Sequence, residues 1–211
     1  MRARAIVPQK RLLEAKSRLE GALSAADRAA LSLAVLSHVC AALKAAPSVE
    51  SIVVMTPDPA ARRQAAAWGI PAIPDRRPGL NDALEQAMRN GGAPHAVLIV
   101  AADLPLLAPE DVEALLRSAG PGRLVLAPSK EGTGTNAVAV PPGMVFHPAY
   151  GGGSLWAHRR AARAGGHEVV EVRRPGLAFD LDTQEDLRAL RYCDVFVPAA
   201  AVPDAARFGW R

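Results

Sequence analysis

The fold class of this 211-residue chain is decided by one stretch, Ala96-Val97-Leu98-Ile99-Val100-Ala101-Ala102-Asp103-Leu104-Pro105. Its first six residues form an uninterrupted apolar run, which is typical of a strand with both faces covered by helices. Leu104 and Pro105 end the run directly after a single carboxylate, Asp103. The stretch therefore predicts a central buried strand that delivers Asp103 into a loop at the edge of a sheet.

Strands and helices alternate on both sides of this stretch. The expected strands are Ala3–Val7, Ser51–Met55, Pro71–Pro74, Ala96–Ala101, Arg123–Ala127, Asn136–Val140, Glu168–Val172 and Leu177–Leu181. The expected helices are Ser24–Leu43, Pro59–Trp68, Leu80–Arg89, Pro109–Ser118, Ser154–Ala164 and Thr183–Leu190. This alternation predicts a Rossmann-like, three-layer α/β fold with a mostly parallel central sheet. We expect one domain over residues 1–191 and an Ala/Pro-rich tail over residues 192–211.

Composition and charge limit the function classes. The net charge of +4 and pI near 9.5 suit a small anionic substrate, although an arginine-rich genome explains the excess equally well. The chain lacks the dense basic patch of a nucleic-acid binder. Two cysteines provide neither a disulfide framework nor a zinc motif. No stretch reaches the roughly 18 apolar residues of a membrane span. We therefore expect a cytoplasmic protein without nucleic-acid or membrane partners.

Three aspartates are candidate metal ligands. Asp103 follows the apolar strand, and Asp180 and Asp182 are two residues apart in a segment expected to be extended. Side chains at i and i+2 of a strand point to the same face, so the last two carboxylates repel each other unless a cation lies between them. A site made only of carboxylate oxygens suits Mg²⁺. The alternative is that Asp103 and Asp182 cap a turn or a helix.

A basic loop follows the first expected strand. It contains Lys10, Arg11, Lys16 and Arg18. Lysine offers a point charge to phosphate, and arginine offers a bidentate fork. The loop is neither a Walker A motif nor a G-x-G-x-x-G motif, and a solvated basic loop is the alternative interpretation.

Two glycine-rich segments are candidate anion sites. In Gly132-Thr133-Gly134-Thr135-Asn136, the glycines allow close backbone approach, and the hydroxyls of Thr133 and Thr135 and the amide of Asn136 offer hydrogen bonds. Gly151-Gly152-Gly153-Ser154 leads into a helix whose free N–H groups can hold an anion. A tight turn with Ser154 as the helix cap is the alternative. His158 is the one histidine near these segments.

Taken in order, these motifs resemble one family, the 2-phospho-L-lactate or phosphoenolpyruvate guanylyltransferases of coenzyme F420 biosynthesis. The family is related to the molybdenum-cofactor guanylyltransferases. The matching motifs are Pro8-x-Lys10, Ala15-Lys16-Ser17-Arg18-Leu19, Gly79-Leu80-Asn81-x-Ala83-Leu84, Ala102-Asp103-Leu104-Pro105-Leu106, Gly132-Thr133-Gly134-Thr135-Asn136, Gly151-x-x-Ser154 with His158, and Gly176-Leu177-x-x-Asp180-x-Asp182-Thr183-x-x-Asp186-Leu187.

The resemblance implies a nucleotidyltransferase fold and transfer of GMP from GTP to a three-carbon phosphorylated acid, with release of pyrophosphate. It implies Mg²⁺ on Asp103, Asp180 and Asp182, and catalytic roles for Lys16, Arg18 and Asp103. The nucleotide would contact Lys10, Lys16, Leu80, Asn81 and Asp103. Thr135, Gly151 and Ser154 match the positions that hold the acid, to which we add Thr133 and Asn136.

Several alternatives remain open. The acid is phosphoenolpyruvate, 2-phospho-L-lactate or 3-phosphoglycerate, which differ by little more than a methyl, methylene or hydroxyl group. Another nucleotidyltransferase, loading a sugar phosphate or the molybdenum cofactor, would need a glycine-rich, arginine-containing loop after the first strand. A non-catalytic nucleotide sensor would have little need of three aspartates. The apolar tail after Arg191 either covers a partner in a homodimer or folds back on its own domain.

Overall fold

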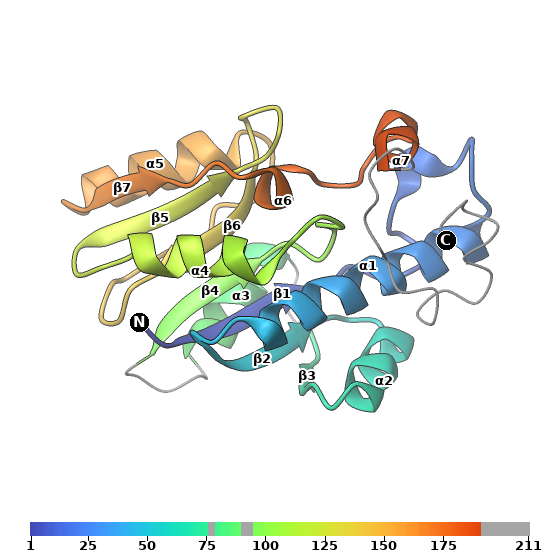
Figure 1. The fold of residues 1–211 in the computed structure, drawn as a ribbon, viewed down its shortest axis with the longest axis horizontal. Helices are drawn as coiled ribbons and strands as arrows, with labels where there is room; N and C mark the ends of the chain where they lie inside the picture. The colour runs from blue at the N-terminus through green and yellow to red at the C-terminus, as the bar shows by residue number, and fades with distance from the viewer. Residues whose placement is uncertain (76–78, 90–94, 191–211) are drawn as a thin grey trace.

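The computed structural model describes residues 1–75, 79–89 and 95–190 (Figure 1). These residues form a seven-stranded sheet in the order β3-β2-β1-β4-β6-β5-β7. The strands are β1 (Ala3–Pro8), β2 (Val49–Met55), β3 (Ala72–Ile73), β4 (Ala96–Val100), β5 (Arg123–Pro128), β6 (Thr135–Val140) and β7 (Glu168–Glu171). The predicted mostly parallel α/β sheet is confirmed. Only β6 runs antiparallel to its neighbours, β4 and β5, among these strands.

The helices are α1 (Ala25–Ala45), α2 (Pro59–Ala67), α3 (Leu80–Arg89), α4 (Pro109–Ser118), α5 (Ser154–Ala164), α6 (Pro175–Ala178) and α7 (Gln184–Leu190), with a 3₁₀ turn, η1 (Ser17–Leu19). The predicted capping box at Thr183 is present, whereas at Ser24 only the bond from Asp27 N–H to the serine side chain forms. Asp27 N–H donates to Ser24 Oγ at 3.1 Å, and Thr183 N–H donates to Asp186 Oδ2 at 2.7 Å. Side-chain acceptors at these positions satisfy backbone donors that the first helical turn leaves free.

Helices cover both faces of the sheet (Figure 1). Val7 and Leu98 point to one face, where they pack with buried residues of α1, α2 and α4. Ile6 and Ile99 are the chain neighbours of Val7 and Leu98. They point to the other face and pack with α3. Residues of β5 and β6 pack with α5 on that second face. The uninterrupted apolar run of β4 thus reflects burial on both sides.

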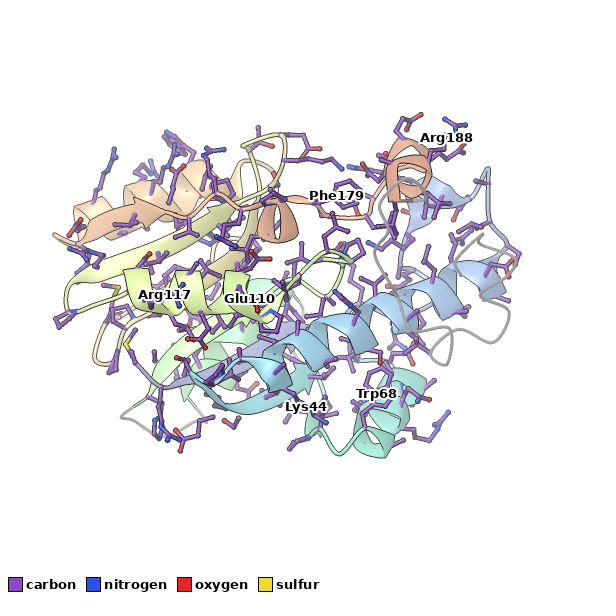
Figure 2. All side chains as sticks on the ribbon, viewed as in Figure 1. Lys44, Trp68, Glu110, Arg117, Phe179 and Arg188 are labelled. Carbon is purple, nitrogen blue, oxygen red and sulfur yellow. The ribbon has the colours of Figure 1, made fainter. Side chains whose placement is uncertain are left out.

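Helix α1 is long and apolar enough, by length and composition, to cross a membrane, contrary to the sequence-based expectation. The expectation rested on the number of apolar residues in a stretch, whereas α1 meets the criterion through its mean hydropathy. In the structure, 56% of its apolar stretch is buried, and it packs against β2 and α4. Near its end, Lys44 Nζ donates to Trp68 O at 2.6 Å, which joins α1 to the end of α2 (Figure 2). Packing in the core accounts for the apolar character of α1.

The predicted strand Leu177–Leu181 is wrong. Pro175 begins the short helix α6 there, because proline suits the first helical turn. Leu177 and Leu181 are fully buried, so their apolar character comes from core packing rather than from sheet pairing. After α6 the chain stays irregular, but Leu181 N–H donates to Asp103 O at 3.0 Å. That bond brings the segment with Asp180 and Asp182 beside the end of β4.

Candidate active site

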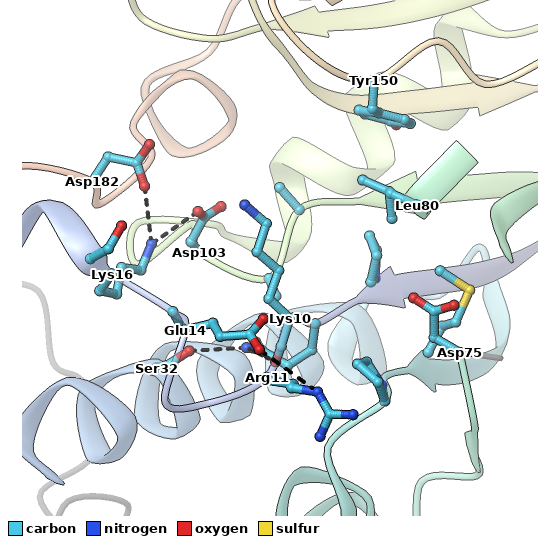
Figure 3. A pocket seen from close by; sticks show the side chains of 18 of the residues that line it. Lys10, Arg11, Glu14, Lys16, Ser32, Asp75, Leu80, Asp103, Tyr150 and Asp182 are labelled. Carbon is cyan, nitrogen blue, oxygen red and sulfur yellow. Dashed lines mark hydrogen bonds and ion pairs between the residues drawn. The ribbon is translucent and has the colours of Figure 1, made fainter. Parts of the chain in front are cut away.

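A cleft of about 660 Å³ opens where β1 and β4 end (Figure 3). Because these strands are parallel neighbours, the residues that follow them meet at the same edge of the sheet. Antiparallel β6 begins at this edge, where Ala101 N–H donates to Asn136 O at 2.8 Å. The cleft is lined by Pro8, Gln9, Lys10, Arg11, Glu14, Ala15, Lys16, Ser17, Arg18, Ser32, Met55, Pro57, Asp75, Leu80, Ile99, Ala101, Ala102, Asp103, Thr135, Tyr150 and Asp182.

The basic loop that follows β1 is anchored to two helices. Gln9 is buried, and its Nε2 donates to Ser32 Oγ of α1 at 3.1 Å. Leu12 N–H donates to Asp58 Oδ2 at 2.9 Å, and the same carboxylate caps α2. Burial raises the pKa of Asp58, but these backbone N–H groups outweigh it and hold the pKa below its usual value. The anchored backbone presents all four predicted cationic side chains, Lys10 among them, to the cleft.

Lys16 is the centre of an ion-pair network in the cleft. Its ammonium donates to Asp103 Oδ2 at 2.9 Å and to Asp182 Oδ1 at 3.4 Å (Figure 3). Its side chain is only 5% exposed. Its φ of 57° makes it the one non-glycine residue with a left-handed backbone in the described parts of the chain. Such a backbone costs about 1–2 kcal/mol and is concentrated at functional sites.

Arg18 and Asp182 extend this network towards solvent. Arg18 Nη1 lies 3.7 Å from Asp182 Oδ2, and the arginine side chain is 74% exposed. An exposed pair of this kind contributes little stability, so Arg18 is free to turn towards a charged ligand.

Asp180 is the least satisfied of the three predicted metal ligands. Its Oδ1 is buried without a hydrogen-bond partner among the described residues. Burial raises the pKa of Asp180, and the charges of Asp103 and Asp182 raise it further. A partnerless buried oxygen beside two other carboxylates fits the oxygen ligands that Mg²⁺ prefers. As arranged, however, no three acidic, histidine or cysteine side chains of the described ranges form a metal-binding group, and the Lys16 ammonium bridges Asp103 and Asp182.

A second network lies behind the start of β6. Thr135 lines the cleft, and buried Ser154 and His158 of α5 contact its hydroxyl. Ser154 Oγ donates to Thr135 Oγ1 at 3.4 Å, and His158 Nδ1 lies 3.1 Å from the same oxygen. Ala149 N–H donates to His158 Nε2 at 2.9 Å. Burial lowers the pKa of His158 to about 4, so its imidazole is neutral at neutral pH.

Of the five residues predicted to bind the acid, only Thr135 lines the cleft; Ser154 lies behind it, and the other three lie elsewhere. Thr133 is exposed, and its carbonyl accepts from Leu155 N–H at 3.1 Å. Asn136 is buried, and its amide donates to the carbonyls of Leu177 and Ala178 in α6. Gly151 is exposed. The structure thus groups Thr135 with Ser154 and uses Asn136 to hold α6.

The residues predicted to bind the nucleotide divide in the same way. Lys10, Lys16, Leu80 and Asp103 line the cleft. Asn81 instead pairs with the backbone of Tyr150, through bonds of 2.8 and 3.1 Å. Both polar atoms of its side chain are therefore used within the protein.

Tyr150 lines the cleft, and sequence reasoning missed it. Its ring packs edge-on to the His158 ring at 5.0 Å between centroids. Its hydroxyl is buried without a partner among the described residues, and burial raises its pKa. The one sequence signal is its place directly before the glycine-rich segment that begins at Gly151.

An open α/β sheet whose cleft combines lysine and arginine side chains with carboxylates is typical of the class of nucleotidyltransferases. Solved structures agree on the fold. A putative nucleotide-diphospho-sugar transferase from Desulfovibrio desulfuricans G20 matches with a TM-score of 0.69 and 16% identity, over 92% of this chain and 88% of that one. Rv0371C from Mycobacterium tuberculosis H37Rv, in complex with manganese, matches with a TM-score of 0.56 and 17% identity, over 90% and 97%.

Sequence comparisons identify the family. The family described as "Guanylyl transferase CofC like" matches residues 3–192, and the chain belongs to it. A phosphoenolpyruvate guanylyltransferase from Sphaerobacter thermophilus is 40% identical, over 88% of this chain and 91% of that protein. One from Rubrobacter xylanophilus is 41% identical, over 88% and 92%. The family resemblance of the sequence motifs is thereby confirmed.

Proposed function

We propose that the protein transfers GMP from GTP to phosphoenolpyruvate. A phosphate oxygen of phosphoenolpyruvate attacks the α-phosphorus of GTP, the bond from that phosphorus to the bridging oxygen of the β-phosphate breaks, and pyrophosphate leaves. The observation that carries the proposal is the arrangement of the cleft, where Lys16 joins Asp103 and Asp182 while the hydroxyl-bearing Thr135 lines the same cavity. Relatives about 40% identical to this chain are named phosphoenolpyruvate guanylyltransferases.

The cationic residues bind the triphosphate in this proposal. Lys10, Lys16 and Arg18 line the cleft on the loop after β1. Their charges hold the phosphates in line for attack and offset the charge that develops on the leaving pyrophosphate. Leu80 and Tyr150 form an apolar wall of the same cleft, where the nucleoside would lie (Figure 3).

Asp103, Asp180 and Asp182 would hold Mg²⁺. The buried, partnerless Oδ1 of Asp180 supports this assignment. The ion supplies charge neutralisation at the nucleotide phosphates when it is bound. Lys16 leaves its carboxylate partners and moves to the phosphates. The manganese complex of a fold neighbour supports a divalent cation in this fold.

Thr135 would hold the acid, with Ser154 behind it. Thr133, Asn136 and Gly151 stay in the proposal as candidates for the acid, and Asn81 as a candidate for the nucleotide. We also propose that the protein is cytoplasmic and acts in coenzyme F420 biosynthesis. A homodimer remains a prediction, because the tail on which it depends lies outside the described residues.

A matrix of substrates tests the function. The protein would be incubated with Mg²⁺, each of the four nucleoside triphosphates, and phosphoenolpyruvate, 2-phospho-L-lactate or 3-phosphoglycerate, and the products would be identified by mass. We expect a diphosphate-linked guanosine adduct and pyrophosphate with GTP and phosphoenolpyruvate. A preference for CTP would indicate another nucleotidyltransferase. Binding of GTP without turnover of any acid would indicate a sensor.

A further inference from the structure

Thr135 is the one predicted acid-binding residue that lines the cleft, and its hydroxyl oxygen is contacted from behind by two buried side chains. A threonine hydroxyl can accept two hydrogen bonds and donate one. Whether it acts as donor or acceptor towards a ligand therefore depends on what Ser154 and His158 do with it.

The roles of the two His158 nitrogens follow from a backbone contact. Ala149 N–H can only donate, and it lies 2.9 Å from His158 Nε2. Nε2 must therefore be the unprotonated nitrogen, and a neutral imidazole then carries its proton on Nδ1. Nδ1 donates to Thr135 Oγ1 at 3.1 Å. The Ser154 hydroxyl oxygen lies 3.4 Å from the same oxygen.

The backbone at Ala149 is itself held in place. Asn81 pairs with both the N–H and the carbonyl of the next residue, Tyr150. The rings of Phe146 and Tyr150 pack on His158, with centroids 5.2 and 5.0 Å away. These contacts fix the imidazole and the direction of its Nδ1–H bond.

We infer that His158 is a positioning residue, which fixes the Thr135 hydroxyl as a hydrogen-bond donor to the anionic group of the acceptor substrate. One acceptor position of Thr135 Oγ1 is used by the Nδ1–H of His158, so the threonine proton points away from the imidazole and can be donated to a ligand in the cleft. A donor suits a phosphate or carboxylate oxygen and disfavours ligand groups that only donate. The inference rests on the proposed function and assigns a role to a histidine that does not line the cleft.

Four variants test the inference through steady-state kinetics. His158→Phe keeps a ring for Phe146 and Tyr150 to pack on but removes the donor. His158→Asn places an amide N–H close to the former Nδ1. Thr135→Val removes the hydroxyl, and the fourth variant combines His158→Phe with Thr135→Val.

We expect His158→Phe to raise KM for phosphoenolpyruvate about tenfold or more, as is typical for loss of a hydrogen bond to a charged group. The KM for GTP should stay unchanged, and His158→Asn should recover most of the affinity. In the Thr135→Val background, His158→Phe should have no further effect, because the histidine acts through that hydroxyl. Additive increases in KM, or an Asn variant as weak as the Phe variant, would overturn the inference.

Nitrogen NMR shifts of the wild-type imidazole test the same inference without any turnover. We expect a proton on Nδ1 and none on Nε2 of His158. The opposite tautomer would overturn the inference even if the Phe variant failed to fold. Absence of guanylyl transfer by the wild-type protein, together with the expected tautomer, would instead contradict the proposed function and leave the positioning of Thr135 supported.

Discussion

Asn81 pairs with both backbone polar groups of Tyr150: Tyr150 N–H donates to Asn81 Oδ1 at 2.8 Å, and Asn81 Nδ2 donates to Tyr150 O at 3.1 Å. The pair joins the first turn of α3 to the segment ahead of α5. Through Ala149 and His158 it also supports the Thr135 hydroxyl. A side chain expected to contact the nucleotide therefore supports the threonine proposed to hold the acid.

Replacing Asn81 with alanine should reduce the free energy of unfolding by about 1–3 kcal/mol, because it leaves two partly buried backbone groups unpaired. It should raise KM for phosphoenolpyruvate and leave KM for GTP unchanged. Urea denaturation and steady-state kinetics measure these effects. Asp82→Ala, at the next and exposed position of α3, is the control and should match the wild type. A rise in KM for GTP alone would show that Asn81 contacts the nucleotide.

Replacing Asp103 with asparagine should abolish most transfer while the protein stays folded. The shape of the side chain is kept, but the charge that pairs with Lys16 is lost. We expect the rate of pyrophosphate release to fall about 100- to 1000-fold, comparable to the loss of one electrostatic contact to a transition state. Asp27→Asn, outside the cleft, is the matched control. Wild-type turnover in the Asp103 variant would remove this residue from the metal site.

Replacing Lys16 with glutamine should strengthen binding of Mn²⁺ to the nucleotide-free protein. The ammonium now bridges Asp103 and Asp182, so its removal leaves their negative charge to the cation. Two unit charges about 4 Å apart interact by at least about 1 kcal/mol. Removing the repulsion between Lys16 and the cation should therefore lower the Kd for Mn²⁺ about fivefold or more. Titration of free Mn²⁺ by electron paramagnetic resonance measures it. Lys44→Gln, on α1, should leave the Kd unchanged, and weaker binding in Lys16→Gln would contradict the assignment of the carboxylates.

Stability should decrease in mild acid because of His158. Burial lowers the pKa of His158 to about 4 in the folded protein, whereas the unfolded chain titrates near 6.5. The unfolded state therefore binds the proton first. The neutral imidazole therefore adds about 3 kcal/mol to the free energy of unfolding above about pH 6.5. This stabilisation is lost as the pH falls to about 4. The variant His158→Phe lacks it, so the stability difference between wild type and variant should shrink over this range. A difference that is constant with pH would contradict a neutral buried imidazole.

The elements that depend on local pattern could be predicted from the sequence. The apolar run of β4 and the N-cap at Ser24 are each set by neighbouring residues. The reversed direction of β6 could not be predicted, because it depends on pairing with β4 and β5 and not on its own residues. The prediction of a strand at Leu177–Leu181 failed for a related reason, since Leu177 and Leu181 are buried in the core without being in a strand.

The candidate site was predictable in its residue types but not in the directions of its side chains. Lys16, Asp103 and Asp182 line one cleft as expected, but the lysine pairs with both carboxylates, which the sequence did not predict. Asn81 and Asn136 carry the polar groups of binding residues, but both bind backbone groups of neighbouring segments. Sequence spacing does not specify such partners, because they come from distant parts of the chain.

The single antiparallel strand β6 gives the two halves of the cleft different connections to the sheet. Asp103 follows β4, whereas Thr135 begins the return strand of a β5–β6 hairpin whose loop spans residues 129–134. A hairpin loop tolerates changes in length and sequence better than the crossovers between parallel strands do. An engineer who wants to change the acid specificity should therefore vary this hairpin and leave β1 and β4 untouched.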